Sequence, residues 1–186
     1  MYQIKITING IAPPIWRRLL VSENITLYKL HHIIQETFGW TNAHLYFFGK
    51  INSKIGNPVL WDDKETTPDD LIKIRDVLVP ENPTLIYTYD MGDHWVHTIA
   101  LEQVLPEMKT QRKCIGGERR CPPEDCGGIP GYQNILKTLK KPGTKEYKEL
   151  AVWLDGKTDP ELIDIRMINA HLGLLSEYIR EYEEGV

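Results

Sequence analysis

Residues able to bind a cation or transfer a proton gather in two short segments of this chain. The first, residues 88–102, reads TYDMGDHWVHTIALE and places Asp90, Asp93 and His94 around a glycine turn, with His97 shortly after. Carboxylate and imidazole groups are common ligands of divalent cations and common acid–base groups, so this turn is a candidate site. Aspartate is also favoured in tight turns because its carboxylate accepts backbone N–H bonds, and that structural explanation stays open.

His97 has a second interpretation of its own. Alternate residues of a strand share one face, which places His97 beside Trp95, Ile99 and Leu101. A histidine among apolar neighbours is typical of a hydrogen-bonded core residue. Both a core role and a ligand or acid–base role therefore remain open for His97.

The second segment, residues 114–132, reads CIGGERRCPPEDCGGIPGY. Its glycine pairs permit positive φ angles, and Pro122 and Pro123 stiffen the approach to Glu124 and Asp125. Two adjacent carboxylates held on a constrained loop suit a binding or acid–base site. Capping of the helix predicted to begin near residue 132 is the competing use of these acids.

The three cysteines, Cys114, Cys121 and Cys126, lie in this same segment, separated by six and four intervening residues. Only the second gap reaches the upper limit of the spacing common in zinc sites. With His97 or His94 as a fourth ligand they predict a structural Cys3His zinc site. The alternative is that they are buried free thiols, as expected in a reducing compartment.

Other chemistries receive little support. The chain has no GxSxG motif, P-loop or GxGxxG fingerprint, which disfavours serine hydrolases and nucleotide-binding proteins. The formal net charge of -4 gives no global attraction to a polyanion. Nucleic-acid contact keeps weak support from local basic residues interleaved with acids, namely Lys109, Arg112, Lys113, Arg119, Arg120, Lys137, Lys140, Lys141, Lys145 and Lys148.

Hydrophobic periodicity predicts the elements that must position these residues. Alternation predicts strands over residues 2–8 and 15–21, helical spacing predicts a helix over 26–38, and a hairpin follows over 84–101. Residues 45–48 and 59–61 are short strand candidates, and residues 67–78 are ambiguous between turn and helix. This order predicts an α+β fold with a β-grasp-like mixed sheet, one main covering helix and a C-terminal helical part.

We expect a single domain over residues 1–186, divided into the sheet and helix (1–105), a Cys/Gly/Pro loop (106–131) and the helical part (132–186). The last helix carries an apolar seam that either docks on its own domain or forms a homodimer, comprising Ile165, Ile168, Leu172, Leu175, Ile179 and Tyr182. No apolar run is long enough for a membrane span and no signal-peptide core is visible, so we expect a cytoplasmic protein without membrane contact.

Several motifs together resemble the plasmid pRiA4b ORF-3-like family. They are GIAPPIWRRLLV, FGW followed by HLYFF, YTYDMGDHWVHTIALE, and CPPEDCGG with GY shortly after, in the expected order over about residues 4–169. The resemblance marks Arg17, Arg18 and Trp95 as candidate binding residues beside the ionisable residues of the two segments. Met91 departs from the family, in which an aromatic residue is common at this position, and this weakens stacking of the turn on a ligand.

The family is uncharacterised, and some members carry transposon-passenger or resolvase-like labels. Resolvase chemistry would need a nucleophilic serine in an arginine-rich site and a helix-turn-helix reader, and neither pattern is visible here. The resemblance therefore implies an accessory protein of mobile-element type without fixing its chemistry.

Three hypotheses follow. The leading one is a non-catalytic binding or accessory module with a polar pocket between the residue 90–97 hairpin and the residue 114–128 loop. The second is a metal-dependent hydrolase or nuclease-like enzyme that uses the carboxylates of both segments and His97. The third is the Cys3His zinc protein, and a divalent metal such as zinc is the one cofactor considered. All require that the two segments meet in space.

Overall fold

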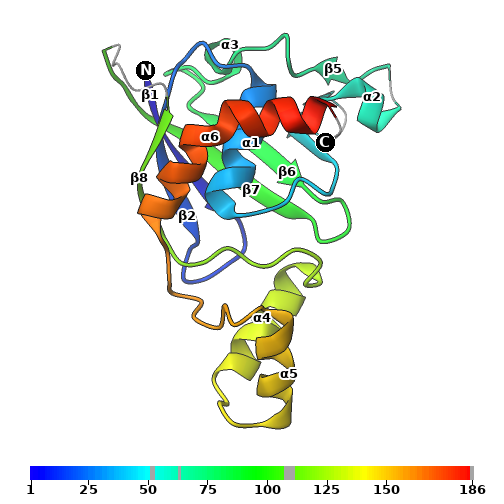
Figure 1. Ribbon diagram of the computed structural model, residues 1–186. Helices are drawn as coiled ribbons and strands as arrows, with labels where there is room; N and C mark the ends of the chain where they lie inside the picture. Colours follow the sequence, from blue (N-terminus) through cyan, green and yellow to red (C-terminus); the bar gives the residue numbers. More distant parts are fainter. Residues whose placement is uncertain (51–52, 63, 107–111, 185–186) are drawn as a thin grey trace.

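The computed structural model describes residues 1–50, 53–62, 64–106 and 112–184, and its strands form one 8-stranded sheet (Figure 1). The order across the sheet is β5-β4-β3-β6-β7-β1-β2-β8. Neighbours pair antiparallel except β4 and β5, which are parallel. The strands are β1 (Tyr2–Ile8), β2 (Trp16–Val21), β3 (Tyr46–Lys50), β4 (Ser53–Gly56), β5 (Thr67–Pro68), β6 (Thr84–Tyr89), β7 (Trp95–Val104) and β8 (Arg112–Glu118).

Two helices, α1 (Leu27–Phe38) and α6 (Ile165–Glu184), pack together over one face of this sheet (Figure 1). Strand β1 shows why: its even-numbered residues are buried, whereas Gln3, Lys5 and Thr7 are partly exposed on the other face. The predicted α+β class is confirmed. The β-grasp resemblance stays a prediction.

Helix α1 has the boundaries that its sequence predicts. The Thr26 hydroxyl accepts a hydrogen bond from the Lys29 N–H at the first turn, and Gly39 ends the helix in the left-handed conformation at φ 79°. Leu27, Leu30 and Ile34 are fully buried against the sheet. The end of α1 is thereby fixed beside Trp40 and the loop that leads to β3.

The seam of α6 is used within the chain. Leu172 and Leu175 are buried in the same core as α1, and Ile165, Ile168 and Ile179 pack against that core. The docked alternative therefore describes this structure, and the face predicted for a homodimer is covered by the chain itself. None of the helices formed by the described residues is both long and apolar enough to cross a membrane.

Two local predictions are wrong. Residues 59–61 belong to the short helix α2 (Pro58–Trp61), because the Asn57 side chain caps the helix and proline occupies its first position. The predicted loop of residues 106–131 contains strand β8, which pairs with β2 at the sheet edge. Residues 107–111 of that loop, including Lys109, lie outside the described residues. The ambiguous stretch contains β5 and the short helix α3 (Ile74–Val77).

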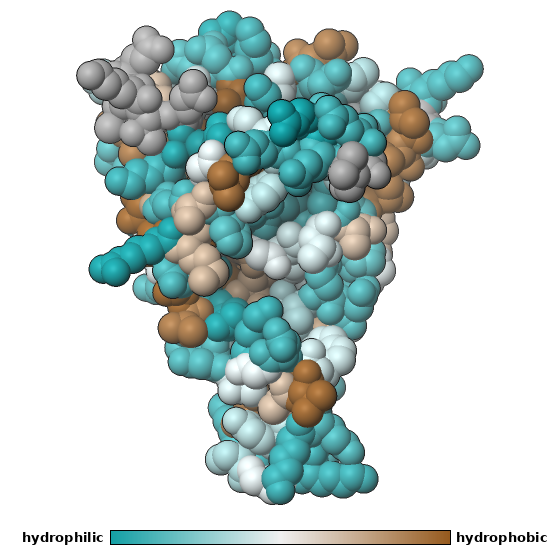
Figure 2. All heavy atoms as spheres, viewed as in Figure 1, coloured by the Kyte–Doolittle hydropathy of each residue, from teal (hydrophilic) through white to brown (hydrophobic). Residues whose placement is uncertain are grey.

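The helices α4 (Gly128–Leu139) and α5 (Lys145–Trp153) form a hairpin that projects from the sheet (Figure 1). Only the first turns of α4 contain buried residues, and α5 contains none. Figure 2 shows a mostly hydrophilic surface over α6 and this hairpin, with hydrophobic residues scattered in small groups. The lysines of the hairpin are at least partly exposed, as expected for a solvated helix face.

Candidate functional site

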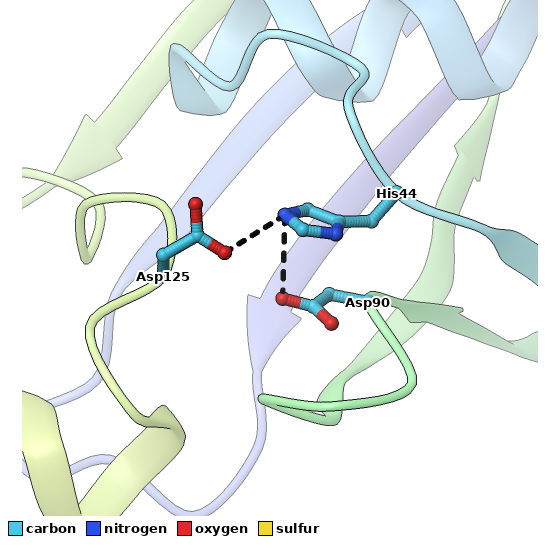
Figure 3. Close-up of side chains that lie close together, drawn as sticks. All are labelled: His44, Asp90 and Asp125. Atoms are coloured by element: carbon cyan, nitrogen blue, oxygen red, sulfur yellow. Dashed lines mark ion pairs between the residues drawn. The ribbon is translucent and has the colours of Figure 1, made fainter.

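Three ionisable side chains from three different connections converge at one end of the sheet (Figure 3). His44 precedes β3, Asp90 follows β6, and Asp125 precedes α4. The Nε2 atom of His44 lies 3.2 Å from Asp125 Oδ1 and 3.7 Å from Asp90 Oδ2. One ligand atom from each residue lies within 4.8 Å of the others, so a single metal ion could contact all three.

Asp90 serves the turn and the site at the same time. It has a left-handed backbone at φ 57°, and its Oδ1 accepts hydrogen bonds from the N–H groups of Gly92 and Asp93. Its side chain is 7% exposed, and Oδ2 faces His44. The turn explanation is thus correct for one oxygen and leaves the other available to a ligand.

Glu124 borders the same site. Its Oε1 accepts hydrogen bonds from the Thr41 N–H and hydroxyl and from the Tyr89 hydroxyl. Its Oε2 is buried, has no hydrogen-bond donor among the described residues, and lies 3.7 Å from His44 Nε2. Burial and the Glu124 carboxylate raise the pKa of Tyr89, which keeps its hydroxyl protonated as a donor.

The geometry around His44 differs from that of a hydrogen bond. Three carboxylate oxygens lie 3.2–3.7 Å from Nε2, yet none of them forms a hydrogen bond with it, and the atom is buried. Two ligands bound to zinc at ~2.0–2.1 Å with a tetrahedral angle would lie about 3.3–3.4 Å apart. The Asp125 oxygen, at 3.2 Å, is close to this ligand–ligand distance, and the Asp90 and Glu124 oxygens, at 3.7 Å, lie a little farther away.

The two segments singled out from the sequence are in contact. Asp93 Oδ2 accepts a hydrogen bond from the Gly127 N–H at 3.1 Å. Gly128 has φ 64°, and a Cβ added there would lie 2.6 Å from the Asp93 carbonyl oxygen. Only glycine allows this approach, which holds the Asp125 loop against the Asp90 turn. Asp93 is thus a positioning residue beside the three-residue group.

His97 lies in the core. It is fully buried, its Nδ1 is 3.0 Å from the Trp95 carbonyl oxygen, and its ring packs edge-on against Phe38 and Trp40. Burial lowers its pKa to about 4, so it is neutral at pH 7. Trp95 is also fully buried, whereas His94 is exposed beside the turn. The core interpretation describes His97 and Trp95.

The cysteines do not assemble the predicted zinc site. Cys114 and Cys121 are buried, Cys126 is partly buried, and all three are free thiols. Burial raises the pKa of each thiol, that of Cys126 to about 12. In the described part of the chain, the group of His44, Asp90 and Asp125 is the one set of three or more such side chains that could share an ion.

The two arginines suggested by the resemblance lie on opposite faces of β2. Arg17 is buried and donates to backbone carbonyls, whereas Arg18 forms a bidentate ion pair with Glu102 on the exposed face. Strand alternation separates the neighbours. Neither belongs to the group around His44.

His44 is the residue that sequence reasoning misses. It opens the quoted HLYFF motif, but a single histidine before a strand has no metal-binding spacing. The usable signal is topological: β3 and β6 are antiparallel neighbours that pair Tyr46 with Tyr89. The start of β3 and the end of β6 therefore meet at one end of the sheet, where His44 and Asp90 lie.

Comparisons with known proteins agree with this architecture. The family model described as plasmid pRiA4b ORF-3-like protein matches residues 1–167. The uncharacterized protein y4hQ of Sinorhizobium fredii is 32% identical over 153 residues, which cover 81% of this chain and 79% of that protein. A crystal structure of a protein of unknown function, MM3350 from Methanosarcina mazei, is 36% identical with a TM-score of 0.81, covering 89% of this chain and 95% of that one.

Proposed function

The chain belongs to the plasmid pRiA4b ORF-3-like family, and we propose that it is a binding module whose polar site holds one divalent transition-metal ion between His44, Asp90 and Asp125. The observation that carries the proposal is the buried His44 Nε2, which has three carboxylate oxygens within 3.7 Å and no hydrogen bond with any described residue. Mixed imidazole and carboxylate ligands favour zinc or a similar ion over calcium or magnesium.

The site would leave the ion open to solvent. Three protein ligands fill three positions of a tetrahedral ion, and zinc sites of this kind keep the fourth position for water or a ligand. The Asp125 side chain is 75% exposed, which places the open side at the surface. A polar or anionic molecule could bind there directly. The accessory role on a mobile element belongs to this proposal and is supported by the family's description alone.

Hydrolysis is the second candidate function, and Glu124 favours it. An acid–base group beside a metal-bound water would need one carboxylate oxygen held in place and one free. Glu124 provides this, since Oε1 has three donors and Oε2 has none among the described residues. Of the catalytic set predicted from the sequence, Asp90, Glu124 and Asp125 surround His44, while Asp93 and His97 have structural partners.

Titration of metal-free protein with Zn²⁺ tests the site. We expect about one ion per chain, with affinity reduced at least about tenfold in Asp90→Asn and Asp125→Asn, because each loses a charged ligand. Asp90→Asn keeps an oxygen able to hold the turn. Asp155→Asn, at an exposed aspartate outside the site, and Cys126→Ser are the controls and should bind as the parent does.

Each result has a definite meaning. Zinc lost in Cys126→Ser but retained in Asp90→Asn would replace this proposal with a thiolate site, and absence of saturable zinc binding would reject it. Glu124→Gln separates the two functions: zinc binding should remain, and a hydrolytic activity that requires the metal should fall by about 10²–10⁴-fold. If the protein binds zinc but hydrolyses neither phosphate-ester nor amide test substrates, the hydrolase is rejected and the binding module is retained.

A further inference from the structure

A separate cavity of about 360 Å³ lies between the C-terminal end of α1, the segment that precedes α6 and the first turns of α6. Much of its lining is apolar and includes Phe38, Leu162, Ile163, Met167 and Ile168. This volume suits a small organic molecule. His44, Asp90 and Asp125 do not line this cavity.

Arg17 gives this cavity its chemistry. Arg17 is only 3% exposed because it lies on the buried face of β2 with Leu19 and Val21, where an apolar side chain would be expected. Its Nε donates to the Thr37 carbonyl at 2.9 Å, and its Nη1 donates to the carbonyls of Trp16 and Glu118 at 2.8 and 3.0 Å. A guanidinium has five N–H groups, so the two on Nη2 remain without a partner among the described residues.

The charge of Arg17 also lacks a counter-ion. No carboxylate of the described residues forms an ion pair with it, and its ring contact is with Phe38, 5.0 Å from the guanidinium carbon. Burial accordingly lowers the pKa of its guanidinium from the ordinary value. A buried charge is costly unless it is paired, and guanidinium groups pair best with carboxylate or phosphate oxygens.

The remaining charged groups of the cavity add to a positive potential. Arg120 and Lys157 are cationic, and the two acids are already engaged: Glu36 lies 3.4 Å from His171 Nδ1, and Asp164 accepts the first N–H groups of α6. Lys157 is paired with Asp155 at 3.8 Å, so Arg17 and Arg120 are the cationic groups of the lining that have no ion-pair partner among the described residues. An anion would therefore be favoured over a neutral or cationic molecule.

We propose that this cavity binds a small organic carboxylate with an apolar body, whose carboxylate oxygen accepts the hydrogen bonds of Arg17 Nη2. The apolar body would contact the side chains that α6 and its preceding segment contribute. This inference does not depend on the metal site, so the two can fail separately.

Phenylacetate and octanoate are suitable probes, with phenylacetamide as a neutral molecule of nearly the same shape as phenylacetate. Binding is measured by calorimetry and by chemical-shift changes on the full chain, with and without EDTA. We expect saturable binding of the carboxylates, at least about tenfold weaker binding of the amide because it lacks the charge, and no effect of EDTA.

Three variants locate the site. Arg17→Met should reduce carboxylate affinity at least about tenfold, while Arg18→Met, its neighbour on the exposed face, should leave it unchanged. Because Arg17→Met also removes three hydrogen bonds to the backbone, Met167→Trp provides a second test, since it fills the cavity from a residue that is 58% exposed. The proposal would be overturned if the acid and the amide bound equally, or if Met167→Trp bound the carboxylates as well as the parent does. It would also be overturned if no saturable binding were found up to ten millimolar, which corresponds to a binding free energy of about 2.7 kcal/mol.

Discussion

The acidic group around His44 and the cavity lined by Arg17 are opposite in charge and in construction. The first is assembled from three connections, with positive φ angles at Asp90 and Asp125, whereas Arg17 occupies an ordinary position of β2, the strand next to the sheet edge. The first leaves His44 Nε2 and Glu124 Oε2 buried without a hydrogen bond among the described residues, and the second leaves the two N–H groups of Arg17 Nη2 without a partner there. Polar groups in folded proteins are normally paired, so an unpaired one beside a cavity or an exposed side chain leaves a hydrogen bond that a ligand can supply.

A row of aromatic rings joins these two regions. The Arg17 guanidinium lies over Phe38, Phe38 stacks on Trp40 with ring centroids 5.7 Å apart, and Trp40 stacks on Tyr89 at 4.9 Å. The Tyr89 hydroxyl then donates to Glu124 at 3.0 Å. A substitution among these rings should therefore affect both regions, whereas a substitution within one region should affect that region alone.

The largest effect should come from Trp40→Ala. Trp40 is 5% exposed, and its Nε1 donates to the Pro122 carbonyl, so the change opens a cavity and releases the residue 121–126 loop. We expect a loss of about 3–5 kcal/mol in the free energy of unfolding, measured with urea. Weaker ligand binding at both regions should accompany it. If binding changed at one region alone, the row of aromatic rings would not connect the two regions.

Next in size is the pH dependence that His97 produces. Its folded pKa of about 4 lies below the ordinary 6.5, so the unfolded chain takes up a proton first as the pH falls. The full contribution of neutral His97 is present above pH 6.5, and about 3 kcal/mol is lost progressively between pH 6.5 and 4. Urea unfolding across this range should show a smaller decline in His97→Gln. An unchanged decline would show that other groups cause it.

A smaller and more selective effect is expected from Asp125→Asn. Its side chain is exposed, so the free energy of unfolding without metal should change by less than about 0.5 kcal/mol. Added Zn²⁺ should raise the thermal midpoint of the parent more than that of the variant, because only an ion that binds the folded chain stabilises it. Equal midpoint shifts in the two proteins would place the ion elsewhere.

The smallest effect concerns Arg18. It forms a bidentate pair with Glu102 at 2.6 and 2.8 Å, but both side chains are partly exposed, at 32% and 24%. Glu102→Gln should cost less than about 0.5 kcal/mol of unfolding free energy, measured by urea denaturation at low salt. A loss several times larger would mean that the exposed face of β2 is not the solvated surface described above.

The sequence predicts the periodic elements well and the site poorly, for physical reasons. Strand β1 and helix α1 bury one face each, which leaves a period in the sequence that can be read directly. Strand β8 escapes prediction because it lies at a sheet edge and contains Gly116 and Gly117.

Side chains in the connections follow no period. His44 meets Asp90 only because the ends of two paired strands coincide, and no spacing rule contains that information. Arg17 leaves a trace, since it places a charge at a buried position of an alternating strand. A charged residue at a strand position where the alternation predicts an apolar one is thus as informative about a site as a recognised motif.

The α4–α5 hairpin has a mechanical consequence. It is anchored at its base, where Gly128 packs under the Asp93 carbonyl, and its outer part stands clear of the sheet (Figure 1). Asp125 is three residues before that base, on the same backbone. We therefore expect a ligand or protein that displaces the hairpin to shift Asp125, the most exposed carboxylate of the three-residue group.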